Sequence, residues 1–143
     1  MGQSSVAFRP LIRGATAAPV PEDQGGADGG EALTKDEQRE VQELKARDRE
    51  VRVHEQAHIA ASGSLSTAGP FYEYETGPDG RRYVVGGEVK VSAPKGRDPE
   101  ETIQIQEQLI RAALAPAEPS AQDRRVAAGA RRKISEAKLE QAE

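Results

Sequence analysis

The spacing of the two histidines constrains this chain more than any other feature. His54 and His58 are the only histidines among 143 residues, and Glu55 directly follows the first of them. They lie within a helical pattern, and residues four apart on a helix sit nearly above one another on one face. Both imidazoles can therefore reach one metal ion, at about 2.0–2.1 Å. The fold must then bring any further ligand to this helix.

The order of these residues, HExxH, predicts a particular chemistry. Glu55 lies beside the open coordination position of a zinc ion, where it can take a proton from zinc-bound water and return it to a leaving amine. We therefore expect one zinc ion per chain, held by His54 and His58, with Glu55 as the catalytic base of a peptidase. The alternative is a charged helix whose two histidines are only surface residues.

A third protein ligand must come from another part of the chain. The sequence has no cysteine, which excludes thiolate zinc sites and disulfides. We choose Glu88, because the two glycines before it, Gly86 and Gly87, predict a bulge or a close backbone approach where a metal-carrying helix can pack. Simple alternation along the strand would turn Glu88 away from the expected core. Three other acids therefore stay open as ligands: Glu73, Glu75 and Asp98.

Three further residues have a candidate role at such a site. Glu50, one helical turn before His54, can hydrogen-bond the second nitrogen of an imidazole, although a surface charge is the simpler interpretation. Tyr74 and Tyr83 can offer a phenol to a developing oxyanion, although cross-strand packing explains them equally well.

The elements that carry these residues follow from local signals. Residues 1–32 are rich in Gly, Ala and Pro without periodicity, and we predict a disordered segment. Residues 33–143 are expected to form one domain. Its first helix begins with a capping box at Thr34 and Glu37 and ends at Gly63, with a break near residues 46–48 if Asp48 acts as a second N-cap.

A β-hairpin is predicted next, from residues 71–76 and 81–92 around a four-residue loop. This register pairs Tyr74 with Tyr83 and Glu75 with Arg82. The face predicted to be the core side carries Tyr72, Tyr74, Tyr83, Val85, Val89 and Val91.

Two more helices complete the predicted fold. One begins at Asp98, with Pro99 in its first turn, and stops before Pro116. The other begins with a cap at Ser120, with Asp123 where Glu or Gln is usual, and its C-terminal end should fray. The expected fold is α+β and mainly helical. A long HExxH helix packs with a hairpin and two further helices in a minimal zincin-like domain.

Composition limits the core and the partners. The chain is 36% hydrophobic, with three tyrosines, two phenylalanines and no tryptophan, so its core is small and a metal or a partner would help to stabilise it. The net charge of -4 does not indicate nucleic-acid binding. No signal peptide or membrane-spanning run is visible, so a cytoplasmic location without membrane contact is the default expectation. The oligomeric state stays open.

Several blocks together resemble a known family. In chain order they are LKARDREVRVHEQAH, PDGRRYVVGGEV, DPEETI and AALAPAEPSAQDRRVAA, which cover roughly residues 40–130. They are similar to the SprA-related family of bacterial zinc metallopeptidases. The resemblance implies a peptide or protein substrate, His54 and His58 as ligands, and Glu55 as the base. Two other functions stay open: a non-catalytic module stabilised by metal, and a helical interaction protein that binds no metal.

Overall fold

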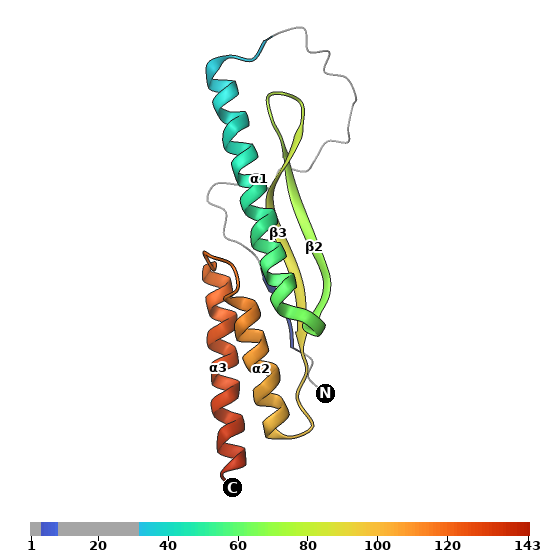
Figure 1. The fold of residues 1–143 in the computed structure, drawn as a ribbon, viewed down its shortest axis with the longest axis vertical. Coiled ribbons are helices and arrows are strands. Elements are labelled where there is room, and N and C mark those ends of the chain that lie inside the picture. Colours follow the sequence, from blue (N-terminus) through green and yellow to red (C-terminus); the bar gives the residue numbers. More distant parts are fainter. Residues whose placement is uncertain (1–3, 9–31) are drawn as a thin grey trace.

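The chain folds into three helices and a small sheet, as a computed structural model describes for residues 4–8 and 32–143. The predicted α+β, mainly helical architecture is confirmed. The long helix α1 (Lys35–Ser62) lies beside the hairpin of β2 (Ser66–Thr76) and β3 (Arg82–Ala93) (Figure 1). Helices α2 (Pro99–Ala113) and α3 (Ala121–Gln141) form an antiparallel pair. No helix in the described residues is long and apolar enough to cross a membrane.

Helix α1 is continuous and has the predicted ends. The Glu37 N–H donates to Thr34 Oγ1 over 3.1 Å, and the Thr34 N–H donates to Glu37 Oε1 over 3.0 Å. Gly63 follows with a φ of 52°, a conformation that favours glycine, and begins a short 3₁₀ turn over Gly63–Leu65. The break considered near residues 46–48 does not occur, because Asp48 is used in a tertiary contact instead of as a cap.

The hairpin forms, but its register differs from the predicted one by a residue. Tyr74 pairs with Val84 and Glu75 pairs with Tyr83, because the loop runs from Gly77 to Arg81, where the Gly77 N–H donates to the Arg81 carbonyl. The pairing then shifts, since Glu73 is opposite Gly86, and Val85 is left as a bulge residue. Four of the six predicted core residues are buried: Tyr83, Val85, Val89 and Val91. Tyr74 is instead 37% exposed, and the Arg82 guanidinium lies over its ring.

A third strand lies within the segment predicted to be disordered. Strand β1 (Ser4–Phe8) pairs antiparallel with β3, from Ser4 opposite Ala93 to Phe8 opposite Val89, and the sheet order is β1-β3-β2. Five residues carry too little pattern to predict a strand by themselves, and the edge of β3 supplies the pairing. The rest of the predicted disordered segment, 1–3 and 9–31, lies outside the described residues.

Helices α2 and α3 pack closely because small residues line their contact. Asp98 caps α2, and Ser120 caps α3, as the sequence predicts. Buried alanines at 112, 113, 127 and 130 let the two backbones approach, and β3 supplies the facing apolar side chains. The main buried cluster consists of Leu65, Val89, Val91, Ala93, Leu109, Ala112, Ala113, Val126, Ala127 and Ala130.

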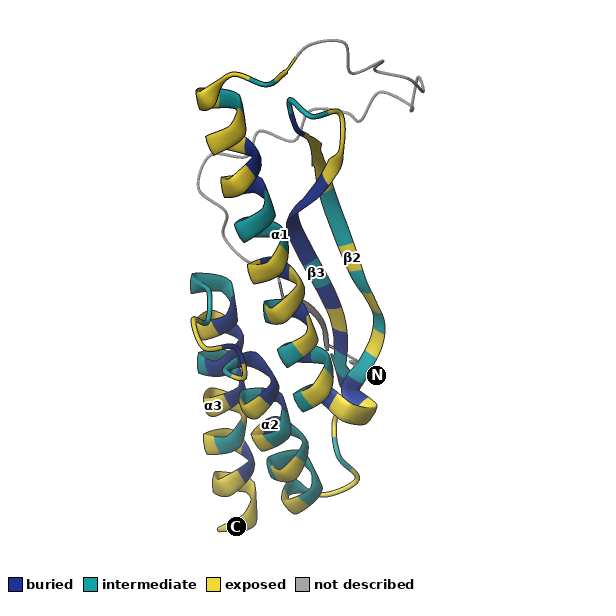
Figure 2. Cartoon of the chain, turned by 45° about the horizontal axis from the view of Figure 1, so that its top comes forward, coloured by how far each residue is buried: buried dark blue, intermediate teal, exposed yellow. Residues whose placement is uncertain are grey.

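A second, smaller cluster lies further along the sheet. It joins Val41 and Leu44 of α1 to Tyr83 and Val85 of β3. The two clusters use different parts of β3, and Figure 2 shows the buried residues running along that strand. Between Val85 and Val89 the strand carries the two buried glycines, and α1 presents the Glu55 side chain to Gly87.

Asp48 ties α1 to the sheet beside the smaller cluster. Its Oδ2 accepts the Val84 N–H over 2.7 Å, and its Oδ1 accepts from Arg52 Nε over 2.7 Å. Val84 is fully buried, and the Asp48 carboxylate is the acceptor for its N–H. The contact holds the pKa of Asp48 below its ordinary value: burial opposes this, but the hydrogen bonds from Val84 and Arg52 outweigh it.

The substitution Asp48→Ala should therefore destabilise the protein by about 1–3 kcal/mol, the cost of leaving a buried N–H unpaired. Urea unfolding at fixed metal content measures the change. The matched control is Glu50→Ala, which removes an exposed carboxylate from the same helix and should change the free energy of unfolding by less than about 0.5 kcal/mol. Equal effects of the two substitutions would contradict the role given to Asp48.

Candidate metal centre

The two histidines of the HExxH segment lie in the C-terminal half of α1, where that helix faces both β3 and α3. His58 is fully buried, and the His54 side chain is 13% exposed. Their rings meet edge to face with centroids 4.8 Å apart, and the two Nε2 atoms are 3.1 Å apart. One turn of helix thus directs both Nε2 atoms to a single point, as the four-residue spacing predicts.

Asp123 brings a carboxylate to the same point from α3. Its Oδ2 lies 3.2 Å from His54 Nε2, and its Oδ1 lies 3.2 Å from His58 Nε2. The carboxylate is fully buried. Within the described part of the chain, this is the one group of three or more His, Cys, Asp or Glu residues close enough to share a metal ion.

The cap of α3 orients this carboxylate. Asp123 occupies the third helical position, where its Oδ2 accepts the Ser120 N–H over 2.8 Å and its own N–H donates to Ser120 Oγ over 3.0 Å. Burial by itself raises the pKa of Asp123, but the hydrogen bonds from His54 and from the Ser120 N–H outweigh it and hold the pKa well below its usual range. The carboxylate is therefore ionised as well as fixed in direction.

The end of α2 determines which nitrogen of His58 carries the proton. His58 Nδ1 lies 2.8 Å from the Ala112 carbonyl oxygen, which is an acceptor only, so Nδ1 donates. In the neutral ring Nε2 then carries a lone pair, as a metal ligand requires. A second contact holds the same two helices together, because Gln108 Nε2 donates to the Ser62 carbonyl over 2.9 Å.

His58 Nε2 and Asp123 Oδ1 consequently present electron pairs to one another in a buried space. Neutral His58 cannot donate to Asp123 Oδ1, and that oxygen has no hydrogen-bond donor among the described residues. Such an arrangement calls for a positive charge at its centre. In a tetrahedral zinc site with bonds of about 2.0–2.1 Å, neighbouring ligand atoms lie roughly 3.3–3.4 Å apart. The two Nε2 atoms, 3.1 Å apart, are close to this separation. Asp123 places a different oxygen 3.2 Å from each imidazole, and one ligand atom from each of the three residues lies within 4.8 Å of the others.

Glu55 lies beside this group and is fully buried. No described residue donates a hydrogen bond to either of its carboxylate oxygens. Burial raises the pKa of Glu55 to about 7; His54 opposes the shift, and the negative charges of Asp123 and Glu88 add to it. A carboxyl group with a pKa near neutral can both take and return a proton.

Most of the chain matches one protein-family model. The model described as the SprA-related family matches residues 24–143, which is most of the chain. The chain belongs to the SprA-related family. No curated protein matches it, and no solved structure matches it. Both halves of the group, the histidines of α1 and Asp123 of α3, lie within the matched residues of this SprA-related protein.

The structure brings Asp123 to the histidines in place of the predicted Glu88. Gly87 faces Glu55, and because side chains alternate along a strand, Glu88 points to the other side of β3. A bulge at the two glycines could have turned the Glu88 side chain toward the histidines, but the bulge lies earlier, at Val85. Glu88 pairs with Phe71 and is partly exposed, so it affects the site only through its charge.

The other candidates also lie outside the group. The Tyr83 hydroxyl donates to the Asp79 carboxylate in the hairpin loop, and its ring packs against Leu44, about 15 Å along α1 from His54. Tyr74 lies under Arg82, and Glu50 is exposed on α1. The acids held open as ligands, Glu73, Glu75 and Asp98, are not members of the group either, and Asp98 caps α2.

One signal for Asp123 was present in the sequence. A capping box normally has Glu or Gln at its third helical position, and this cap has aspartate. The cap alone explains an acid at that position, so nothing in the sequence required a second role. Only the tertiary structure, in which the start of α3 reaches α1, shows that the same carboxylate meets two histidines.

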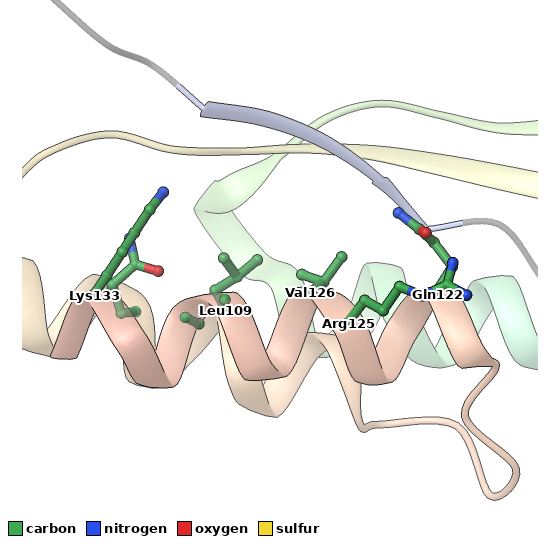
Figure 3. Close-up of a pocket in the computed structure, with 8 residues that line it drawn as sticks. Leu109, Gln122, Arg125, Val126 and Lys133 are labelled. Atoms are coloured by element: carbon green, nitrogen blue, oxygen red, sulfur yellow. The ribbon is translucent and has the colours of Figure 1, made fainter. Parts of the chain in front are cut away.

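Residues next to Asp123 in the chain line a separate groove on the flank of α3, and this groove does not include the metal-ligand group. It has a volume of about 280 Å³ and is lined by residues of α2 and α3, among them Gln122 and Val126, and β1 passes over it (Figure 3). Asp123, which lies between these two residues in the chain, does not line it.

Replacing the third residue of the group provides a direct test of its role. Asp123→Asn keeps an oxygen that can accept the Ser120 N–H but removes the negative charge, so we expect zinc affinity to fall roughly a hundredfold or more. Glu88→Gln makes the same chemical change outside the group, and should alter affinity by less than about threefold. Competition with a chromophoric chelator measures both. A larger loss for Glu88→Gln would make Glu88 the ligand.

Proposed function

We propose that this chain is a zinc-dependent peptidase in which His54, His58 and Asp123 hold one zinc ion and Glu55 is the general base. One observation carries the proposal: Glu55 is buried without a hydrogen-bond donor from the described residues, beside three ligand atoms that converge. A buried acid of this kind destabilises a fold and is typical of catalytic sites.

The number of ligands supports a catalytic site over a structural one. Structural zinc usually has four protein ligands, whereas catalytic zinc has three and keeps a fourth position open. Among the described residues, only three ligand atoms meet here, and they are two imidazoles and one carboxylate. Glu55, which follows the ligand His54, is not one of the three, so it is available for acid–base chemistry.

In the proposed reaction, Glu55 transfers a proton, and other residues of the chain hold the ligands in position. A bound zinc ion supplies a Lewis acid, which polarises a carbonyl and makes water more acidic. The Glu55 carboxylate takes a proton from water at one of its Oε atoms, and later returns that proton to the amine that leaves. The Ala112 carbonyl keeps the His58 imidazole in place during both transfers, and the Ser120 N–H keeps the Asp123 carboxylate in place. The resemblance to zinc metallopeptidases supports a peptide or protein substrate.

The decisive experiment measures metal and turnover together. We expect protein purified without a histidine tag to retain about one zinc per chain after dialysis, as measured by ICP-MS. Hydrolysis of a labelled unfolded protein should fall by at least about 10²–10⁴-fold in Glu55→Gln, because the base is lost, while zinc content stays the same. Glu50→Gln, an exposed carboxylate on the same helix, serves as the matched control. Undiminished hydrolysis in Glu55→Gln would refute the mechanism.

A second candidate function is a module in which zinc only holds the fold together. It is favoured by one observation: the ligand group joins α1 to α3 in a chain whose apolar core is divided into two clusters. Both functions predict that chelation lowers the melting temperature, since ligands that bind only the folded state stabilise it. Chelation that lowers the melting temperature in a protein without hydrolytic activity would favour this candidate. No uptake of zinc at all would exclude both and leave an interaction protein.

A further inference from the structure

Gly87 of β3 is in direct contact with the side chain of Glu55. A Cβ atom placed on Gly87 would lie 2.8 Å from Glu55 Cγ, 3.2 Å from its Cδ and 3.2 Å from its Oε1. These are the three nearest heavy atoms outside the neighbouring residues, and all belong to Glu55. The glutamate side chain therefore lies flat against the backbone of the strand, in space that any other residue would fill.

The need for glycine here is one of space and not of backbone conformation. The described glycines with positive φ are Gly63, Gly69 and Gly80, and Gly87 is not among them. Gly87 lies inside a strand, opposite Tyr72, where glycine weakens a sheet and β-branched residues are usual. Something other than strand geometry must favour glycine at this position, and the contact with Glu55 supplies a physical reason.

We infer that Gly87 is a positioning residue for the general base: its missing side chain lets the Glu55 carboxylate lie beside the metal ligands. The inference rests on the proposed function. Two of the ligands are held from other directions, His58 by the Ala112 carbonyl and Asp123 by the Ser120 N–H. A methyl group on Gly87 must therefore displace Glu55, whereas no atom of the three ligand side chains lies closer to it than 3.2 Å.

The first test replaces Gly87 by alanine and measures zinc and kinetics. A separation of 2.8 Å is too short for two carbons, and Cγ is not the free end of the side chain, so the carboxylate has to move. A misplacement of about 1 Å can reduce turnover roughly a hundredfold. We expect Gly87→Ala to retain one zinc per chain, to lose roughly that factor in kcat, and to keep KM within about threefold.

The control for the extra methyl group is Gly129→Ala. Gly129 lies inside α3, and the nearest atom to an added Cβ is the end of Arg132, 3.6 Å away. This substitution should leave zinc content and kcat unchanged. A fall in kcat for both variants would mean that the loss does not come from the contact with Glu55.

Two further readouts need no turnover, so they separate this inference from the proposed function. In a double-mutant cycle, Gly87→Ala should lower the melting temperature by about 5 °C in the wild type but by much less in Glu55→Ala, which lacks the atoms that clash. In cobalt(II)-loaded protein, Gly87→Ala should shift the visible spectrum as Glu55→Gln does, and Gly129→Ala should not. Equal destabilisation in both backgrounds, or an unchanged cobalt spectrum, would overturn the role of Gly87. If the wild type has no hydrolytic activity but the melting temperatures and the cobalt spectrum change as expected, only the proposed peptidase function is rejected.

Discussion

The contact of the Asp123 carboxylate with His54 and His58 is the interaction on which this structure depends. It links the start of α3 to the end of α1, two helices separated in the chain by the hairpin and by α2. Two of the three side chains are held by a backbone group at a helix end, Asp123 by the Ser120 N–H and His58 by the Ala112 carbonyl. Helix ends leave such groups unpaired, and here they orient a buried polar centre.

This polar centre divides the apolar core into two clusters and places buried ionisable side chains between them. Apolar packing occurs on either side of it, around Leu44 and Val85 in one cluster and around Leu109 and Val89 in the other. Between them lie buried ionisable side chains, one of which, Glu55, has no hydrogen-bond donor among the described residues. Burying such groups destabilises a small domain. A cation bound by the three ligands would offset part of this, so metal binding and folding should be coupled.

Local signals in the sequence predicted the helices well and the hairpin less well. The caps at Thr34, Asp98 and Ser120 each act within four residues, so a short window contains all the atoms involved. The hairpin register depends on the length of the loop and on the bulge at Val85. Each extra residue in the loop or in the bulge shifts all the residue pairs that follow it. Strand β1 had no signal of its own, because only the free edge of β3 makes five residues a strand.

The sequence by itself determined that two imidazoles and a carboxylate lie together on one helix, because the spacing of His54, Glu55 and His58 and the pitch of a helix suffice for that. Only the tertiary structure decided that Asp123 joins them and Glu88 does not. The two acids have the same chemistry, and no local pattern says which will reach the histidines. The packing of α3 on α2, which in turn packs on α1, brings Asp123 there, while alternation along β3 turns Glu88 away and leaves Gly87 against Glu55.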